Sequence, residues 1–346
     1  MSRMTQTLLE LHRDGALTEV ESIEVAPGGF ATRITYRNGT CRMTGLGDLG
    51  IDPSSASRAL MDKSITKHFL AAMQVACPKG KTLLLPWWAQ RAGPDAAALP
   101  YAQLSSFAEG VEFAERELGF PVFVKPVDGN RGAGVWRCDT AQDVYGSLEQ
   151  LDLSRFGVAL IEEGVSLPDY RLVALGGEFI CGYRRTPLGV IGDGRSTILQ
   201  LAKDAQKRFR SSGREVTIDC DDQRIARCLA RSGLRLHSVP DAGHRVQLHD
   251  ISNLAAGGTA EDVTHCVAPR WRDLACTITE SFGTGLCGVD LACADIRSDD
   301  ADYSVLEVNT CPGFDHYRSL GEHQEALVRS LYIRVLNVAP PRPWAV

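Results

Sequence analysis

The segment DLACADIRSDDADYSVLEVNTCPGF, residues 290–314, constrains the fold most strongly. It predicts two strands joined by a polar turn, and apolar and polar residues alternate along the second strand. Because side chains two positions apart on a strand share a face, Glu307 and Asn309 point the same way. If the strands pair as a hairpin, Asp290 lies near both. Two carboxylates and an amide oxygen suit Mg2+ or Mn2+, although carboxylates at a strand end more often face water.

Length and charge restrict the class of protein. The 346 residues exceed one minimal core and predict two or three lobes. A net charge of −6 does not suit a protein that coats nucleic acid or an anionic membrane. We expect no transmembrane helix and no signal peptide, because no apolar run approaches about 18 residues. The eleven cysteines form no C-x-x-C pair, which predicts reduced thiols in the cytoplasm.

Two lysine-containing segments precede the middle of the chain. A helix through MDKSITKHFLAAMQ places Lys63 and Lys67 four residues apart on one face, which by itself indicates only a solvated face. The triplet 80–82, Gly-Lys-Thr, resembles the end of a P-loop. We reject a P-loop because Val75 stands where its first glycine belongs, and because the helix precedes the triplet.

A glycine-rich turn follows in VKPVDGNRGAGV. Lys125 ends an apolar strand, and Gly129, Gly132 and Gly134 lie between it and the next strand. Glycines let backbone N–H groups approach phosphate oxygens, and the lysine adds a positive charge. A flexible hairpin is the alternative interpretation, but the whole pattern is less common than its glycines alone.

Further polar groups end other predicted strands. Glu162 and Glu163 close one strand, and Arg184 and Arg185 close another as a cationic pair of the kind that binds carboxylates or phosphates. A second small-residue loop, SNLAAGGTAED, allows close approach of its backbone to a ligand.

Four separate features occur in one order along the chain, and together they resemble the ATP-grasp fold. They are the helix with Lys63, the glycine loop after Lys125, the strand end at Glu162 and the D…E-x-N pattern of the hairpin. Over roughly residues 57–316 the sequence is most similar to the ATP-grasp region of cyanophycin synthetases, in segments such as VKPVDGNRGAGV, DYRLVALGG, SNLAAGGTAEDVTH and LEVNTCPGF. The resemblance implies an α+β fold with mixed antiparallel sheets and flanking helices in three lobes. We expect a small N-terminal piece at 1–55, the rest of the N-terminal lobe at 56–104, a central lid lobe at 105–175 and a C-terminal lobe at 176–346.

The resemblance also implies roles for individual residues. Lys63 and Lys125 would contact the phosphates of ATP, beneath a closing loop formed by Asn130 to Gly134, including Gly132. Glu162, Glu163 and Val165 would form the hinge beside the adenine, and Asp169 would hold the ribose. Asp290, Glu307 and Asn309 would ligate Mg2+, with Mn2+ as the alternative ion. Arg185 and Asn253, together with Lys125, would act on the reacting carboxyl group.

The sequence departs from the family pattern in two places. His249-Asp250 stands where an arginine is expected, and Asp315 to Arg318, which includes His316, follows Pro-Gly-Phe. Both segments should line the substrate pocket, so the cyanophycin substrates are in doubt.

These features predict an ATP-dependent carboxylate–amine ligase that works through an acylphosphate and releases ADP and phosphate. A small-molecule kinase and a non-catalytic ATP-binding subunit are the alternatives. We expect a cytoplasmic homo-oligomer whose partners are a small carboxylate and a small amine, both amino-acid-like, without nucleic acid or membrane. The Mur-ligase-like half of cyanophycin synthetases has no counterpart in the sequence, so we expect one amide per cycle.

Overall fold

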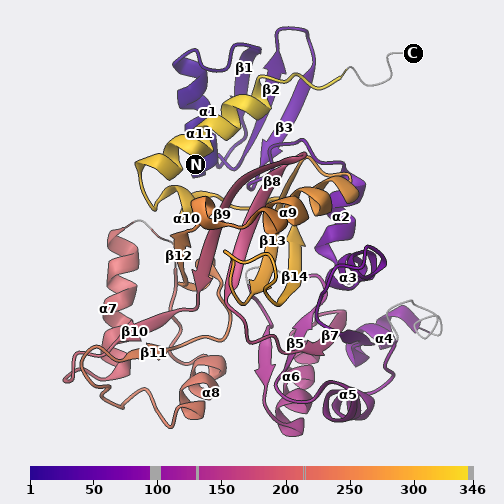
Figure 1. Cartoon of the computed structure of the whole chain (residues 1–346), viewed down its shortest axis with the longest axis vertical. Helices are drawn as coiled ribbons and strands as arrows, with labels where there is room; N and C mark the ends of the chain where they lie inside the picture. Colours follow the sequence, from indigo (N-terminus) through magenta and orange to yellow (C-terminus); the bar gives the residue numbers. More distant parts are fainter. Residues whose placement is uncertain (94–102, 130–131, 213, 215, 342–346) are drawn as a thin grey trace.

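The computed structural model describes residues 1–93, 103–129, 132–212, 214 and 216–341 (Figure 1). Asn130, expected in the closing loop, lies outside these residues. The described chain forms four sheets, with every strand antiparallel to its sheet neighbours. This arrangement confirms the expected α+β class. Within the described ranges, no helix is long and apolar enough to cross a bilayer.

The N-terminal lobe joins the first and last helices around one small sheet. Its elements are α1 (Arg3–Arg13), β1 (Val20–Val25), β2 (Ala31–Tyr36), β3 (Cys41–Gly45) and α11 (Glu322–Leu336). Leu8 of α1, Ile34 of β2 and Leu331 of α11 belong to one buried cluster. Figure 1 shows α11 beside α1 at the top of the molecule. The two helices therefore stabilise each other, although about 300 residues separate them in sequence.

The lid lobe is a four-stranded sheet covered by helices on one face. Its elements are β4 (Gly80–Leu84), α4 (Pro86–Ala92), α5 (Phe107–Phe113), a π-helix (Ala114–Leu118), β5 (Val122–Pro126), β6 (Trp136–Cys138), α6 (Ala141–Leu153) and β7 (Val158–Glu163). The strand order is β4-β7-β5-β6. Val122 and Val124 point toward the helices and are fully buried. Phe123 and Lys125 alternate with these valines along β5 and therefore face the opposite side, toward the rest of the molecule.

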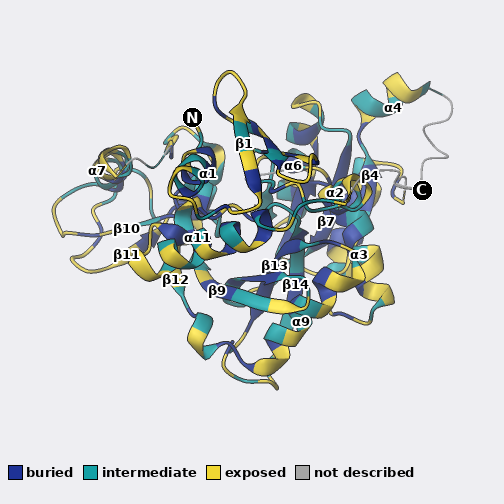
Figure 2. Ribbon diagram, turned by 90° about the horizontal axis from the view of Figure 1, so that it is seen from above, coloured by how far each residue is buried: buried dark blue, intermediate teal, exposed yellow. Residues whose placement is uncertain are grey.

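The central sheet carries most of the site. Its strands, in spatial order, are β12 (Thr259–Asp262), β9 (Glu178–Thr186), β8 (Asp169–Leu175), β13 (Leu286–Cys293) and β14 (Tyr303–Asn309). One face packs Leu172 and Val289 against α9 (Pro269–Ser281) around the buried Trp271. The other face packs Val173 and Cys181 against the N-terminal lobe. Seen from above, β13 is dark blue along its length in Figure 2, because all of its residues are buried.

The remaining elements flank this sheet or form a small unit below it. They are α2 (Ser54–Met61), α3 (Lys63–Ala72), β10 (Gly189–Ile191), α7 (Ile198–Ser211), α8 (Gln223–Arg231), β11 (Arg245–Gln247), two 3-10 turns (Leu254–Ala256 and Thr264–Cys266) and α10 (Asp315–Arg318). Residues 187–250, which contain β10, β11, α7 and α8, enclose a separate cluster that includes Val190, Ile225 and Leu248. We call this segment the α7–α8 unit.

The sheets divide the chain at different places from the expected lobe boundaries. β4 was expected in the N-terminal lobe but pairs with β7 of the lid sheet. β8 was expected in the lid lobe but lies between β9 and β13 in the central sheet. The reason is that backbone hydrogen bonds across a sheet join strands far apart in sequence, and neither strand carries a local signal for its partner.

Candidate active site

The β13–β14 hairpin places the three expected metal ligands on one face, as its alternation predicts. Asp290 pairs with Glu307, and Gly288 pairs with Asn309. Gly288 also makes room for β8, because a Cβ at this position would stand 3.2 Å from Cδ of Arg171. The pairing of β8 with β13 places Arg171 directly opposite Asp290.

Two arginines contact the carboxylate of Asp290. Arg171 donates to Oδ1 from Nε at 2.6 Å and to Oδ2 from Nη2 at 2.8 Å. Nη2 of Arg185 lies 2.9 Å from Oδ2 of Asp290 and donates to Oδ1 of Asp169 at 2.7 Å. The four side chains form a buried quartet of two cations and two anions.

Charge decides the protonation of this quartet. Burial alone would raise the pKa of Asp290. The positive charges of Arg171 and Arg185 together outweigh burial, so this pKa lies below its usual range. Burial is the larger effect at Asp169, whose pKa is raised although Arg185 opposes the shift. Asp290 is therefore the anion that the two arginines neutralise. The expectations that Asp290 binds metal and that Asp169 holds a ribose both require these ion pairs to rearrange.

Glu307 and Asn309 fit a metal ion more directly. Oε1 of Glu307 lies 3.3 Å from Nζ of Lys63, and about a third of its side chain is exposed. Nδ2 of Asn309 is buried without a hydrogen-bond partner among the described residues. A metal ion would be bound by Oδ1 of Asn309 and by the part-exposed carboxylate of Glu307, since Mg2+ takes oxygen ligands and completes its shell with phosphate oxygens and water. In the described part of the chain, no group of three or more His, Cys, Asp or Glu side chains is arranged to hold a metal.

Three lysines converge on the lid side of the site. Lys63 and Lys67 lie on α3, and Lys125 lies near the end of β5. Nζ of Lys63 donates to the carbonyl of Gly129 at 2.7 Å, which ties α3 to the start of the glycine loop. Glu162 lies between the other two, with Oε1 2.5 Å from Lys125 and Oε2 2.8 Å from Lys67. Lys67 was interpreted as part of a solvated face, and that interpretation is wrong because only 11% of its side chain is exposed.

The hinge expected at the end of β7 is only partly visible in the geometry. The Glu162 carboxylate points into the lysine cluster and is 4% exposed, so its side chain does not face an open adenine site. Glu163 accepts a hydrogen bond from the backbone N–H of Lys79 at 3.0 Å. Val165 follows the strand and is half-buried. A contact between this segment and adenine stays a prediction, and it would have to use backbone groups.

The glycine loop meets the C-terminal half of the chain. Gly132 and Gly134 both have positive φ, at 75° and 68°, where a Cβ is disfavoured. A Cβ on Gly132 would stand 2.2 Å from Ile251 and 3.3 Å from Nδ2 of Asn253. Oδ1 of Asn253 accepts from the N–H of Ala255 and caps the following 3-10 turn. The amide of Asn253 therefore borders the loop, and its role at the reacting carboxyl group stays a prediction.

The departures from the family pattern lie in two different environments. His249 and Asp250 line a hollow together with Arg137, Arg224 and Arg227, between the lid lobe and the α7–α8 unit. Burial and the nearby Arg224 lower the pKa of His249, so its imidazole is neutral at pH 7.

Arg318 has a structural role, contrary to the expectation that it lines a substrate pocket. It donates to Oε2 of Glu325 at 2.5 Å and to the hydroxyl of Thr7 at 2.9 Å, and is 6% exposed. The half-buried His316 lies within the same short helix, α10, and burial lowers the pKa of its imidazole.

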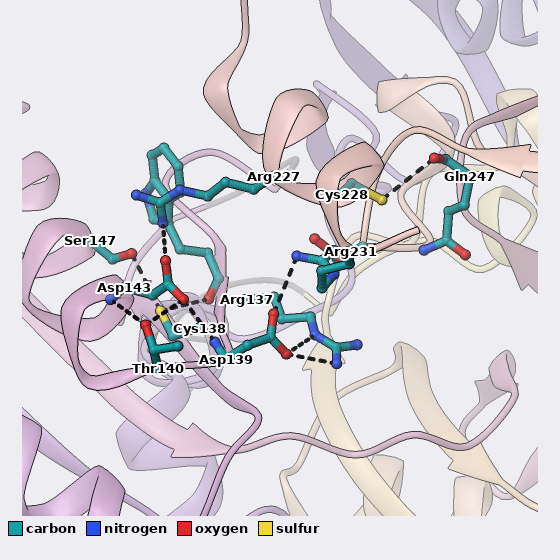
Figure 3. A network of polar contacts seen from close by, with 12 residues as sticks. Arg137, Cys138, Asp139, Thr140, Asp143, Ser147, Arg227, Cys228, Arg231 and Gln247 are labelled. Atoms are coloured by element: carbon teal, nitrogen blue, oxygen red, sulfur yellow. Dashed lines mark hydrogen bonds and ion pairs between the residues drawn. The ribbon is translucent and has the colours of Figure 1, made fainter. Parts of the chain in front are cut away.

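Ion pairs hold the α7–α8 unit against the lid lobe. Figure 3 shows Arg227 and Arg231 of α8 directed at acidic side chains around the start of α6. Nη1 of Arg227 lies 3.5 Å from Oδ1 of Asp143, and Nη1 of Arg231 lies 3.4 Å from Oδ2 of Asp139. Arg231 also pairs with Asp250. These ion pairs join segments about 90 residues apart in sequence.

Comparison with known proteins identifies the class. No protein-family model matches the sequence. The cyanophycin synthetase of Trichormus variabilis is 30% identical over 264 residues, which cover 73% of this chain and 26% of the relative. The glutathione biosynthesis bifunctional protein of Streptococcus mutans is 31% identical over 203 residues, 56% of this chain and 26% of the relative. The chain therefore spans about a quarter of the length of these relatives.

A solved structure confirms the fold. The bifunctional glutathione synthetase of Pasteurella multocida superimposes with a TM-score of 0.55 at 19% identity, covering 95% of this chain and 43% of that one. The fold and the sequence similarity together define an ATP-grasp protein. Within that class, the chain is related to the ATP-grasp region of cyanophycin synthetases, as the sequence motifs indicated.

Proposed function

We propose that this chain is an ATP-dependent carboxylate–amine ligase that joins two small, amino-acid-like substrates. The observation that carries the proposal is the meeting of two kinds of group at one place. Lys63 and Lys125 provide cations for phosphates, and Lys63 contacts Glu307. Arg171 and Arg185 contact Asp290, which pairs with Glu307 in the hairpin of the central sheet. Arginine forks suit a carboxylate, and lysines suit phosphate oxygens as point charges.

The proposed reaction has two steps. A carboxylate oxygen of the first substrate attacks the terminal phosphorus of ATP, the bond to ADP breaks, and an acylphosphate forms. The nitrogen of a neutral amine then attacks the acyl carbon, phosphate leaves, and the nitrogen loses a proton to give the amide. Glu307 and Asn309 would hold Mg2+, which supplies charge neutralisation for the transferring phosphoryl group.

The side chains of this protein orient and neutralise rather than form covalent intermediates. Lys63 spans the site, since it contacts both Glu307 and the backbone of Gly129, so it can order the loop and the metal side together. Arg185 is the group that can turn from Asp290 toward a substrate carboxylate. Positioning and charge stabilisation are the main contributions that such a reaction needs.

The first test is ADP release from ATP and Mg2+ with a panel of carboxylates and amines. We expect ADP to appear at a catalytic rate only when the correct acid and amine are both present. Release with one substrate alone, together with a phosphorylated product, would instead indicate a kinase. The absence of turnover in every pair, with nucleotide still bound, would favour a non-catalytic ATP-binding subunit.

The second test concerns the size of the product. We expect mass spectrometry of the active pair to show one condensation product, a dipeptide or pseudo-dipeptide, because the residues that the structure describes form one site of this kind. A ladder of masses spaced by a repeating unit would contradict this expectation and indicate polymerisation. Omitting ATP is the matched control, since no amide should then form.

We also propose a cellular compartment and an assembly state for the enzyme. All eleven cysteines are free, which suits a reducing compartment, and we place the enzyme in the cytoplasm as a homo-oligomer. Gel filtration with light scattering would measure the assembly.

A further inference from the structure

Lys67 is a buried cation that the proposed reaction does not yet use. It lies one turn after Lys63 on α3, and its Nζ donates to the carbonyl of Pro78 at 3.0 Å. The same atom lies 2.8 Å from Oε2 of Glu162, whose other oxygen is 2.5 Å from Nζ of Lys125. One carboxylate is therefore shared between two ammonium groups. The three side chains are at most 11% exposed.

Glu162 cannot easily leave this position. It lies on β7, the strand between β4 and β5, so its backbone is paired on both sides. Gly80 on β4 is its neighbour, and a Cβ there would stand 3.0 Å from Cβ of Glu162. Burial raises the pKa of Glu162, but Lys125 and Lys67 together lower it below its usual range, so the carboxylate stays charged.

Lys67 changes the net charge of the cluster that it forms with Lys125 and Glu162. Lys67 and Lys125 carry two positive charges against the single negative charge of Glu162, so the trio keeps a net charge of +1. Without Lys67, Glu162 and Lys125 would form a neutral pair. Because water is largely excluded, a neutralised Lys125 would attract phosphate much less than a charged trio does.

We propose that Lys67 is a positioning residue of the nucleotide site, which shares the carboxylate of Glu162 and so keeps the charge of Lys125 available to the phosphates of ATP. The inference rests on the proposed function, since Lys125 must bind phosphate. It also gives Glu162 a role through its side chain, as the group that fixes the spacing of two lysines.

The test is a double-mutant cycle read by calorimetric binding of ADP and of a non-hydrolysable ATP analogue, each with Mg2+. We expect Lys67→Met to weaken nucleotide binding by about tenfold or more, which corresponds to about 1.4 kcal/mol. Adding Glu162→Gln to Lys67→Met should return the affinity to within about threefold of wild type, because Lys125 then has no carboxylate to neutralise it. Lys67→Arg should bind nearly as wild type does.

Controls separate this idea from a loss of structure. Lys81 lies on β4 of the lid sheet and forms an exposed ion pair with Glu117. Lys81→Met should therefore leave nucleotide binding unchanged. Thermal unfolding of each variant shows whether it is folded. If Lys67→Met does not fold, Lys67→Gln makes the same comparison with a neutral side chain that keeps a polar end.

The outcomes also separate this inference from the proposed function. If Lys125→Met binds nucleotide as wild type does, the proposed phosphate site is wrong. If Lys125→Met loses binding while Lys67→Met retains it, only the role of Lys67 is overturned. If Lys67→Met binds weakly and the double variant binds equally weakly or worse, Lys67 acts by direct contact or by packing, and the sharing of Glu162 is refuted.

Discussion

Replacing Glu307 by Gln should reduce turnover by about a hundredfold or more while the protein stays folded. The substitution keeps the size of the side chain but removes the negative charge that we assign to Mg2+. Losing a metal ligand costs several kcal/mol of transition-state stabilisation, and each 1.36 kcal/mol is about a tenfold change in rate. Because about a third of the Glu307 side chain is exposed, the fold should tolerate the change. The measurement is kcat with the active substrate pair across a Mg2+ titration.

The matched control is Glu178→Gln. Glu178 pairs with Arg334 at the surface, far along the central sheet from the hairpin, and more than half of its side chain is exposed. We expect this variant to keep the kcat and the Mg2+ requirement of wild type. Near-normal turnover of Glu307→Gln at limiting Mg2+ would show that the metal ligands are misassigned.

Replacing Asp290 by Ala should lower the free energy of unfolding by about 3–5 kcal/mol in metal-free buffer. Asp290 is the anion that both Arg171 and Arg185 contact, and all three side chains are at most 16% exposed. Asp169 can still partner Arg185, but Arg171 would be left as a buried cation without its carboxylate. Urea unfolding with a chelator present measures the loss without interference from metal binding.

An exposed ion pair provides the control for this prediction. Asp295 contacts Arg297 at 2.9 Å, and both side chains are largely exposed. Exposed pairs contribute about 0–1 kcal/mol, so Asp295→Ala should barely shift the urea midpoint. If Asp290→Ala shifts the midpoint no more than Asp295→Ala does, the quartet does not stabilise the fold, and its arginines serve another purpose.

The hairpin was predictable because its information is local. Glu307 and Asn309 share a face through strand alternation alone, and the polar turn between the strands predicted their pairing. The neighbours of Asp290 were not predictable in the same way. Arg171 is 119 residues away in sequence, and it meets Asp290 only because β8 pairs with β13. A motif gives the residue types of a site, whereas the contacts between motifs depend on sheet order.

The lysine cluster is a second case in which the sequence predicts the residue types but not their contacts. Two lysines four apart on a helix predict a shared face but not whether that face is buried. Lys67 is buried because α3 lies against the end of the lid sheet, where the side chain of Lys67 forms an ion pair with Glu162. Glu162 lies near the end of the apolar strand β7, and a continuous apolar run does not tell which face of the sheet its side chain occupies. Only the register of β7 with β5 settles that Glu162 lies on the same side as Lys125.

The shared core of α1 and α11 has a consequence for biosynthesis. The segment 1–45 leaves the ribosome before Leu331 does, yet Leu8 and Ile34 pack in a cluster that also includes Leu331. At a usual synthesis rate of about 5–20 residues per second, the earliest strands wait about 15–60 seconds for their covering helix. During that interval their apolar faces are available to chaperones or to other nascent chains. The sheet of β1, β2 and β3 thus completes its core only after α11 has been synthesised, which makes the yield of the protein in a cell sensitive to the speed of translation.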